Sequence, residues 1–120
     1  MSLLFDSPIE SVRPWGKFVE FTQNEPTTVK IITVNPHEAL SLQRHHKREE
    51  FWFVISGLGK VEIDGEEFKI TPGSKFVIPK ESTHRVTAGS LPVMFLEIST
   101  GDFDEGDIVR LEDKYGRISK

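Results

Sequence analysis

Short runs of apolar and β-branched residues, separated by turn residues, recur along most of this chain. The runs occupy residues 15–22, 27–34, 39–45, 51–55, 60–63, 67–70, 75–78, 83–87 and 91–98. Turn signals such as Asp64-Gly65 and Pro72-Gly73 lie between them, and no stretch has a helical period. Short strands with regularly spaced turns are typical of an all-β sandwich or barrel. The pattern therefore predicts one all-β domain with at most a turn or two of helix.

The two ends of the chain depart from this pattern. We expect residues 1–12 to be an N-terminal arm, residues 13–100 to form the barrel, and residues 101–120 to be a tail that packs on it. Within the tail, Ile108–Leu111 fits either a turn of helix or an edge strand. A chain of 120 residues is long enough for one domain with a sizeable core.

Charge and composition narrow the classes of partner. The net charge is −4 and there is no basic stripe, which argues against a nucleic-acid-binding protein. No segment approaches the ~18 consecutive apolar residues of a membrane helix, so we expect no membrane partner. Residues 1–10 are too acidic and too short in apolar length for a signal peptide. The absence of cysteine fits a reducing compartment, and we expect a cytoplasmic protein.

The most informative stretch is residues 43–57, QRHHKREEFWFVISG. On an extended strand, side chains alternate between faces, so Gln43 and His45 share one face while His46 lies on the other. Glu50 follows closely enough for a bend to return it to the first face. Such a set of oxygen and nitrogen ligands predicts a divalent metal site. The alternative is a polar hairpin followed by a buried strand.

A second stretch, residues 73–88 (GSKFVIPKESTHRVTA), carries Gly73, Pro79 and His84. Together with the first stretch it resembles the two motifs of the cupin superfamily. The resemblance implies a jelly roll, the double-stranded β-helix barrel, and one divalent metal ion, without distinguishing Zn, Mn, Co, Fe or Ni. In the usual first motif two histidines precede a glutamate, and Gln43 stands here at the position of the first histidine. The metal ligands implied by the resemblance are Gln43, His45, Glu50 and His84.

Several short motifs extend the likeness to type II mannose-6-phosphate isomerases. They are RPWG at 13–16, LSLQ at 40–43, HH.R at 45–48, SG at 56–57, IP….HR at 78–85 and DIVRLEDKYGR at 107–117. The resemblance implies conversion of mannose 6-phosphate to fructose 6-phosphate through an enediol. In many relatives this domain follows a mannose-1-phosphate guanylyltransferase. No such domain precedes it in this sequence, so we expect no nucleotidyltransferase activity.

The chain departs from the family at Lys47 and Phe51, where histidines are usual, and at Ala88, where asparagine is frequent. These positions are not among the implied ligands, so we expect the metal site to be retained. The substrate can differ from that of the family. Lys47 fits either a phosphate contact or a solvated side chain. Arg48 is the candidate catalytic residue, as a substrate contact, with an ion pair to Glu49 or Glu50 as the alternative. The spacing does not identify the base that transfers the proton.

Two arginines of the tail motif, Arg110 and Arg117, are candidates for binding the phosphate of a small sugar-phosphate substrate, because guanidinium groups bind phosphate through two hydrogen bonds. The alternative is that they dock the tail through Glu112 and Asp113. Arg85 follows His84 on a predicted strand, so we expect it to face away from the metal.

Two other functions fit the same residues. Two histidines and one glutamate with an open face also suit a non-haem iron dioxygenase. A non-catalytic sugar-binding cupin is the third possibility.

The unbroken apolar run Phe51–Ile55 predicts a strand that avoids water on both faces. One face would line the barrel, and the other would need cover. We expect a two-fold homodimer built on this sheet, with the Arg13–Gly16 segment and its Trp15 exchanged between protomers. In the alternative, the arm or the tail of the same chain covers that face and the protein is a monomer.

Overall fold

The computed structural model describes residues 9–101, 103–104 and 106–118. Residues 1–8, which make up most of the predicted arm and of the region inspected for a signal peptide, lie outside the described residues. Throughout the described ranges the regular elements are strands, with no helix long and apolar enough to cross a membrane.

The strands follow the runs predicted from the sequence, with two additions at the ends of the chain. They are β1 (Ile9–Arg13), β2 (Gly16–Glu20), β3 (Thr28–Val34), β4 (Leu42–Arg44), β5 (Arg48–Ser56), β6 (Gly59–Ile63), β7 (Glu66–Ile70), β8 (Lys75–Ile78), β9 (His84–Ala88), β10 (Val93–Gly101) and β11 (Val109–Glu112). Every pairing between these strands is antiparallel.

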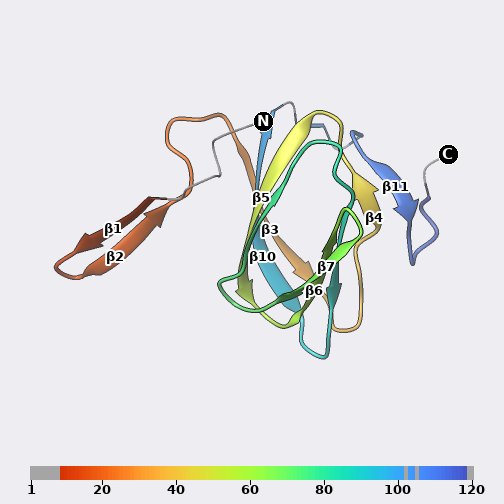
Figure 1. Ribbon diagram of the computed structural model, residues 1–120, viewed down its shortest axis with the longest axis horizontal. Helices are drawn as coiled ribbons and strands as arrows, with labels where there is room; N and C mark the ends of the chain where they lie inside the picture. Colours follow the sequence, from red (N-terminus) through yellow and green to blue (C-terminus); the bar gives the residue numbers. More distant parts are fainter. Residues whose placement is uncertain (1–8, 102, 105, 119–120) are drawn as a thin grey trace.

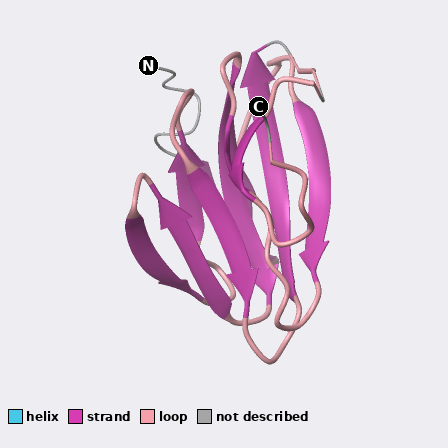
Figure 2. Ribbon diagram, turned by 90° about the vertical axis from the view of Figure 1, so that its right-hand side faces the viewer, coloured by secondary structure: helices cyan, strands magenta, loops and turns pink. Residues whose placement is uncertain are grey.

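Two sheets make up the body of the molecule (Figure 1). One has the order β3-β10-β5-β8 and the other β11-β4-β9-β6-β7. Figure 1 shows the two sheets on opposite sides of the barrel, and Figure 2, which turns the side with β4 and β11 toward the viewer, shows strands joined by loops. The apolar core between them consists of Val34, Trp52, Val54, Val61, Ile70, Ile78, Val86, Ala88, Val93 and Phe95. This arrangement confirms the predicted all-β jelly roll.

Strand β5 is buried on both of its faces. Trp52 and Val54 point into the core between the sheets. Phe51 and Phe53 point outward and pack against Phe21, whose ring centroid lies 5.3 Å and 5.6 Å from theirs. The unbroken apolar run thus reflects two separate packing environments, and part of the outer face is covered by the same chain.

The N-terminal hairpin, β1 and β2, forms a separate two-stranded sheet that projects from the barrel (Figure 1). Residues 9–12 are therefore strand, where the sequence predicted an arm without regular structure. The RPWG motif makes the connecting turn, and Gly16 has φ +145°, a value that other residues rarely adopt. The predicted strand 15–22 is correspondingly shorter at both ends.

The tail contains the edge strand β11 rather than a turn of helix. It pairs with β4, with Val109 opposite Arg44 and Arg110 opposite Gln43. Alternating apolar and charged residues in IVRLE suit a half-exposed edge strand. The pairing places the last motif of the sequence beside the residues of the first.

Candidate metal centre

The predicted ligands lie close together because side chains alternate between the two faces of a strand and because β4 pairs with β9. His45 directly follows β4 and is buried, whereas His46 is exposed, as alternation predicted. Glu50 lies on β5, and His84 begins β9, where it pairs with Gln43 of β4. The group therefore draws on three strands of the two facing sheets.

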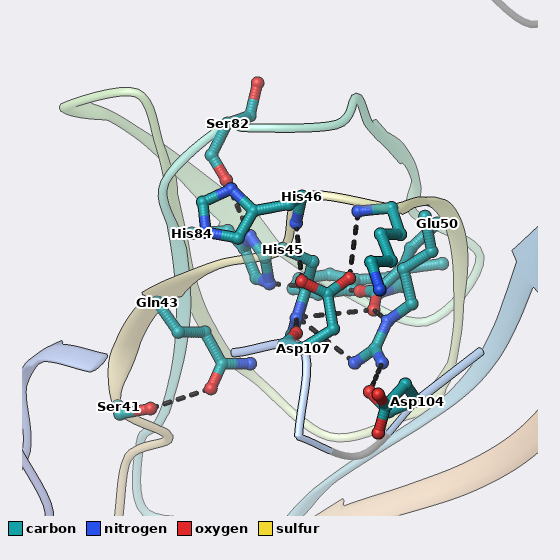
Figure 3. Close-up of polar contacts among 12 residues, drawn as sticks. Ser41, Gln43, His45, His46, Glu50, Ser82, His84, Asp104 and Asp107 are labelled. Atoms are coloured by element: carbon teal, nitrogen blue, oxygen red, sulfur yellow. Dashed lines mark hydrogen bonds and ion pairs between the residues drawn. The ribbon is translucent and has the colours of Figure 1, made fainter. Parts of the chain in front are cut away.

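His45, Glu50 and His84 form a compact buried group (Figure 3). Nε2 of His45 lies 3.5 Å from Oε2 of Glu50, and Nε2 of His84 lies 3.9 Å from Oε1. The nearest ligand atoms of the three residues all lie within 4.8 Å of one another. This spacing suits one ion bound by all three side chains.

Backbone carbonyl groups fix the orientation of both imidazole rings. Nδ1 of His45 donates to the carbonyl oxygen of Asp107 at 2.6 Å, and Nδ1 of His84 donates to that of Ser82 at 3.0 Å. Because a carbonyl can only accept, the proton resides on Nδ1 and the lone pair of each Nε2 faces Glu50. Burial also lowers the pKa of both histidines, which keeps the rings neutral and able to bind a metal.

His84 provides a direct test of whether these residues fit a metal. Its Nε2 is buried and has no hydrogen-bond partner within the described residues. A buried acceptor without a partner is unfavourable, and a cation at this position would satisfy it. Two imidazole nitrogens and a carboxylate are donors that Zn, Mn, Co, Fe and Ni all accept, so the residues fit the group.

Gln43, the fourth predicted ligand, lies beside His84 in the β4–β9 pairing. Its Oε1 accepts a hydrogen bond from Ser41 Oγ at 2.7 Å (Figure 3). An amide oxygen has two lone pairs, so this bond leaves one for a metal. Ligation by Gln43 stays a prediction.

Arg48 forms an ion pair with Glu50 rather than with Glu49. Its Nε donates to Glu50 Oε2 at 2.9 Å, and its Nη2 lies 3.2 Å from His45 Nε2. Residues two apart on a strand share a face, which selects Glu50. Its role as a substrate contact stays a prediction.

Two neighbours of Glu50 were not identified from the sequence. Trp52 donates from Nε1 to Glu50 Oε1 at 3.1 Å. Glu97 lies opposite Trp52 on β10 and is buried; burial, followed by the charge of Glu50, raises its pKa to about 7. The alternation of β10 around Phe95 was the available signal, since it places Glu97 on the same inward face.

Asp107 holds the turn that carries His45, and the sequence did not predict this role. Its carboxylate accepts the backbone N–H groups of His46 and Lys47, each at 2.9 Å. With its carbonyl bound to His45, this one residue fixes the turn that carries the ligand. The side chain of Lys47 itself is exposed, and its phosphate role stays a prediction.

The tail arginines differ from each other. Arg117 is exposed, and its Nε and Nη2 donate at 2.7 Å and 3.1 Å to Asp113 of the same tail, so this ion pair is local to the tail. Arg110 pairs with Gln43, so its side chain shares the face that carries the ligands. Arg85 forms ion pairs with glutamates of β6 and β11, consistent with the expectation that it faces away from the metal.

Two antiparallel sheets enclose the buried His–Glu–His group, and solved cupin structures share this fold. The solved structure of a cupin protein from Bacteroides fragilis is similar to it, with a TM-score of 0.59 and 23% identity over 68% of this chain and 74% of that one. Over residues 5–113 the chain matches the family described as "Mannose-6-phosphate isomerase C-terminal", and it belongs to that family. The resemblance proposed from the sequence is thereby confirmed.

Curated relatives are longer proteins. Mannose-1-phosphate guanylyltransferase ManC of Salmonella typhimurium is 40% identical over 91% of this chain and 23% of its own length. Alginate biosynthesis protein AlgA of Pseudomonas aeruginosa is 41% identical over 92% of this chain and 24% of its own length. The chain thus spans about a quarter of these relatives, one named as a guanylyltransferase and the other for alginate biosynthesis.

Proposed function

We propose that this cupin is a metal-dependent sugar-phosphate isomerase that interconverts mannose 6-phosphate and fructose 6-phosphate. The observation that carries the proposal is the buried group of His45, Glu50 and His84, with both Nε2 lone pairs turned toward the carboxylate. The description of the family to which the chain belongs names mannose-6-phosphate isomerase, which supports the proposal. The fold alone supports no choice among activities, so the site and the family carry the proposal together.

In this proposal His45, Glu50, His84 and Gln43 hold one divalent metal. The metal would act as a Lewis acid toward the carbonyl and hydroxyl oxygens of the open-chain sugar, stabilising the negative charge of the enediol. Gln43 is neutral, so the ligand set carries only the charge of Glu50. A set with one negative charge leaves the cation more electrophilic than a set with two carboxylates.

The remaining residues bind and orient the sugar phosphate. Arg110 shares the ligand-bearing face with Gln43, and Lys47 is exposed on the turn beside His45. These positions support a proposed contact of both cationic side chains with the phosphate group. We omit Arg117 from the phosphate site, since Asp113 of the same tail already holds its guanidinium group.

A coupled assay tests the proposal. The protein is stripped with a chelator, reloaded separately with Mn, Co, Zn, Fe or Ni, and mixed with mannose 6-phosphate. Formation of fructose 6-phosphate with at least one metal is the expected result. Oxygen consumption with Fe(II) and no isomerisation would instead identify a dioxygenase. Saturable binding of the sugar phosphate without turnover would identify a binding protein.

A further inference from the structure

The guanidinium group of Arg48 contacts the same side chains that would hold the metal. Its Nε donates to Glu50 Oε2 at 2.9 Å, and its Nη2 donates toward His45 Nε2 at 3.2 Å. Arg48 is itself buried, with only 6% of its surface exposed. A buried cation is thus placed directly against two of the ligand atoms.

The hydrogen bond to His45 and metal ligation exclude each other. Nδ1 of His45 donates to the Asp107 carbonyl, so Nε2 has a single lone pair in the ring plane. That lone pair can accept an N–H of Arg48 or bind a cation, but not both. Glu50 can share its oxygens between the two, since each carboxylate oxygen has two lone pairs. The repulsion between a divalent ion and a nearby guanidinium adds to the conflict.

We propose that Arg48 competes with the metal for His45, and that metal binding displaces the guanidinium group toward the segment that follows β10. Two further contacts of Arg48 lie on that segment. Its Nη1 donates to the Asp104 carbonyl at 3.3 Å, and its Cζ lies 4.6 Å from the centroid of the Phe103 ring. Neither contact involves a ligand, so both can hold the side chain after it leaves His45.

This inference rests on the metal centre of the proposed function and adds a coupling to it. A displaced guanidinium group has N–H donors that His45 no longer occupies, and these are available to an anionic ligand such as a phosphate monoester. Arg48 would therefore restrain the ligands until the metal arrives and bind the substrate afterwards. It acts as a positioning residue in the first state.

Metal affinity measures the competition without any assay of turnover. Chelator-stripped protein is titrated with Zn²⁺ against a chromophoric competitor, for the unchanged chain and for Arg48→Met, which keeps the length but removes the charge and donors. We expect Arg48→Met to bind Zn²⁺ about tenfold more tightly, the worth of one charge-assisted hydrogen bond. The same substitution should lower the melting temperature of stripped protein, because His45 and Glu50 lose a buried partner.

Lys47→Met is the matched control, since it removes one positive charge from the adjacent residue without touching His45 or Glu50. We expect its Zn²⁺ affinity to change much less. Equal affinity in the parent and Arg48→Met, or weaker binding in Arg48→Met, would overturn the competition while leaving the metal centre in place. If Arg48→Met fails to fold, Arg48→Lys must bind Zn²⁺ more tightly than the parent for the inference to stand. An absence of binding in all variants would overturn the metal centre itself.

Two exposed apolar surfaces lie away from the metal centre: the projecting hairpin and the outer face of the β3-β10-β5-β8 sheet. Both expose large apolar side chains. On the hairpin Val12 is 75% and Trp15 74% exposed, and on β3 Ile31 is 62% and Val29 55% exposed. An isolated two-stranded hairpin is at best marginally stable in water, so the hairpin needs a surface on which to pack.

We infer that a second copy of this chain covers that outer face with its hairpin. Phe21, which follows the hairpin directly, already packs on the outward rings of β5, so this region of the chain suits the surface. In a two-fold dimer each hairpin would cross the exposed part of the partner's sheet, and both surfaces would be buried at once. Burying one large apolar side chain gains roughly 1.5–3 kcal/mol, and this arrangement buries several from each copy.

Light scattering at micromolar concentration tests the assembly. We expect twice the chain mass of 13.7 kDa for the parent and about the chain mass for Trp15→Glu and for Ile31→Glu. Leu91→Glu is the control, because Leu91 is 50% exposed in the turn between β9 and β10 and should leave the mass unchanged. A parent of 13.7 kDa, or a dimer that resists both substitutions, would overturn the inference.

Discussion

Replacing His84 by alanine is expected to remove nearly all tightly bound metal while leaving the barrel folded. Nε2 of His84 has no hydrogen-bond partner among the described residues, so no hydrogen bond of the fold depends on it. Only the bond from Nδ1 to the Ser82 carbonyl is lost. Metal content after desalting, measured by mass spectrometry, should fall to background, and the far-ultraviolet circular dichroism spectrum should keep its β-sheet form.

The neighbouring histidines distinguish ligation from proximity. His45→Ala should lose metal as His84→Ala does, because His45 also turns its Nε2 toward Glu50. His46→Ala should retain it, since the ring of His46 is exposed and pairs with Glu81 at 2.5 Å. Equal metal loss in all three variants would refute the assignment of His45 to the inner face and His46 to the outer one.

Trp52→Ala is expected to cause a large loss of stability. The side chain is 2% exposed, its ring centroid lies 4.9 Å from that of Phe95 and 5.4 Å from that of His84, and its Nε1 donates to Glu50. Removing a buried aromatic ring costs about 3–5 kcal/mol through lost contacts and the cavity left behind. Because domains of this size are stable by only about 5–15 kcal/mol, the urea midpoint should fall sharply.

Trp52→Phe separates the two roles of this side chain. Phenylalanine retains most of the aromatic contact in the core but lacks the N–H that donates to Glu50. We expect a smaller shift of the urea midpoint than for alanine. A free energy of unfolding for Trp52→Ala within about 1 kcal/mol of the parent would show that the core does not depend on this ring.

The fold could be predicted because its strands carry their own patterns. β3 is rich in β-branched residues, β5 is an unbroken apolar run, and Asp64-Gly65 connects β6 to β7. β1 was missed, since IESVR is polar and its residues are largely exposed, which removes the alternation that identifies a strand. β1 forms because it pairs with β2, so its own residues do not predict it.

The candidate site was predictable where local alternation decides it. That rule separates His45 from His46, and it also selects Glu50 over Glu49 as the partner of Arg48. The support from Asp107 was not predictable, because it comes from a residue 62 positions away in the chain. Contacts of this kind follow from the closure of the whole barrel, and no short pattern encodes them.

Because His45 is held by a residue far along the chain, Asp107, the metal centre can form only at a certain stage of folding. Gln43, His45 and Glu50 are close in the chain, but His84 and Asp107 join them only after β4 has paired with β9 and β11. Pairings between distant segments are the slow steps of folding, because the entropy of closing the loops must be overcome first. A complete set of ligands therefore exists only late, when the chain is nearly native. Metal present from the start should leave the refolding rate almost unchanged and should instead slow unfolding.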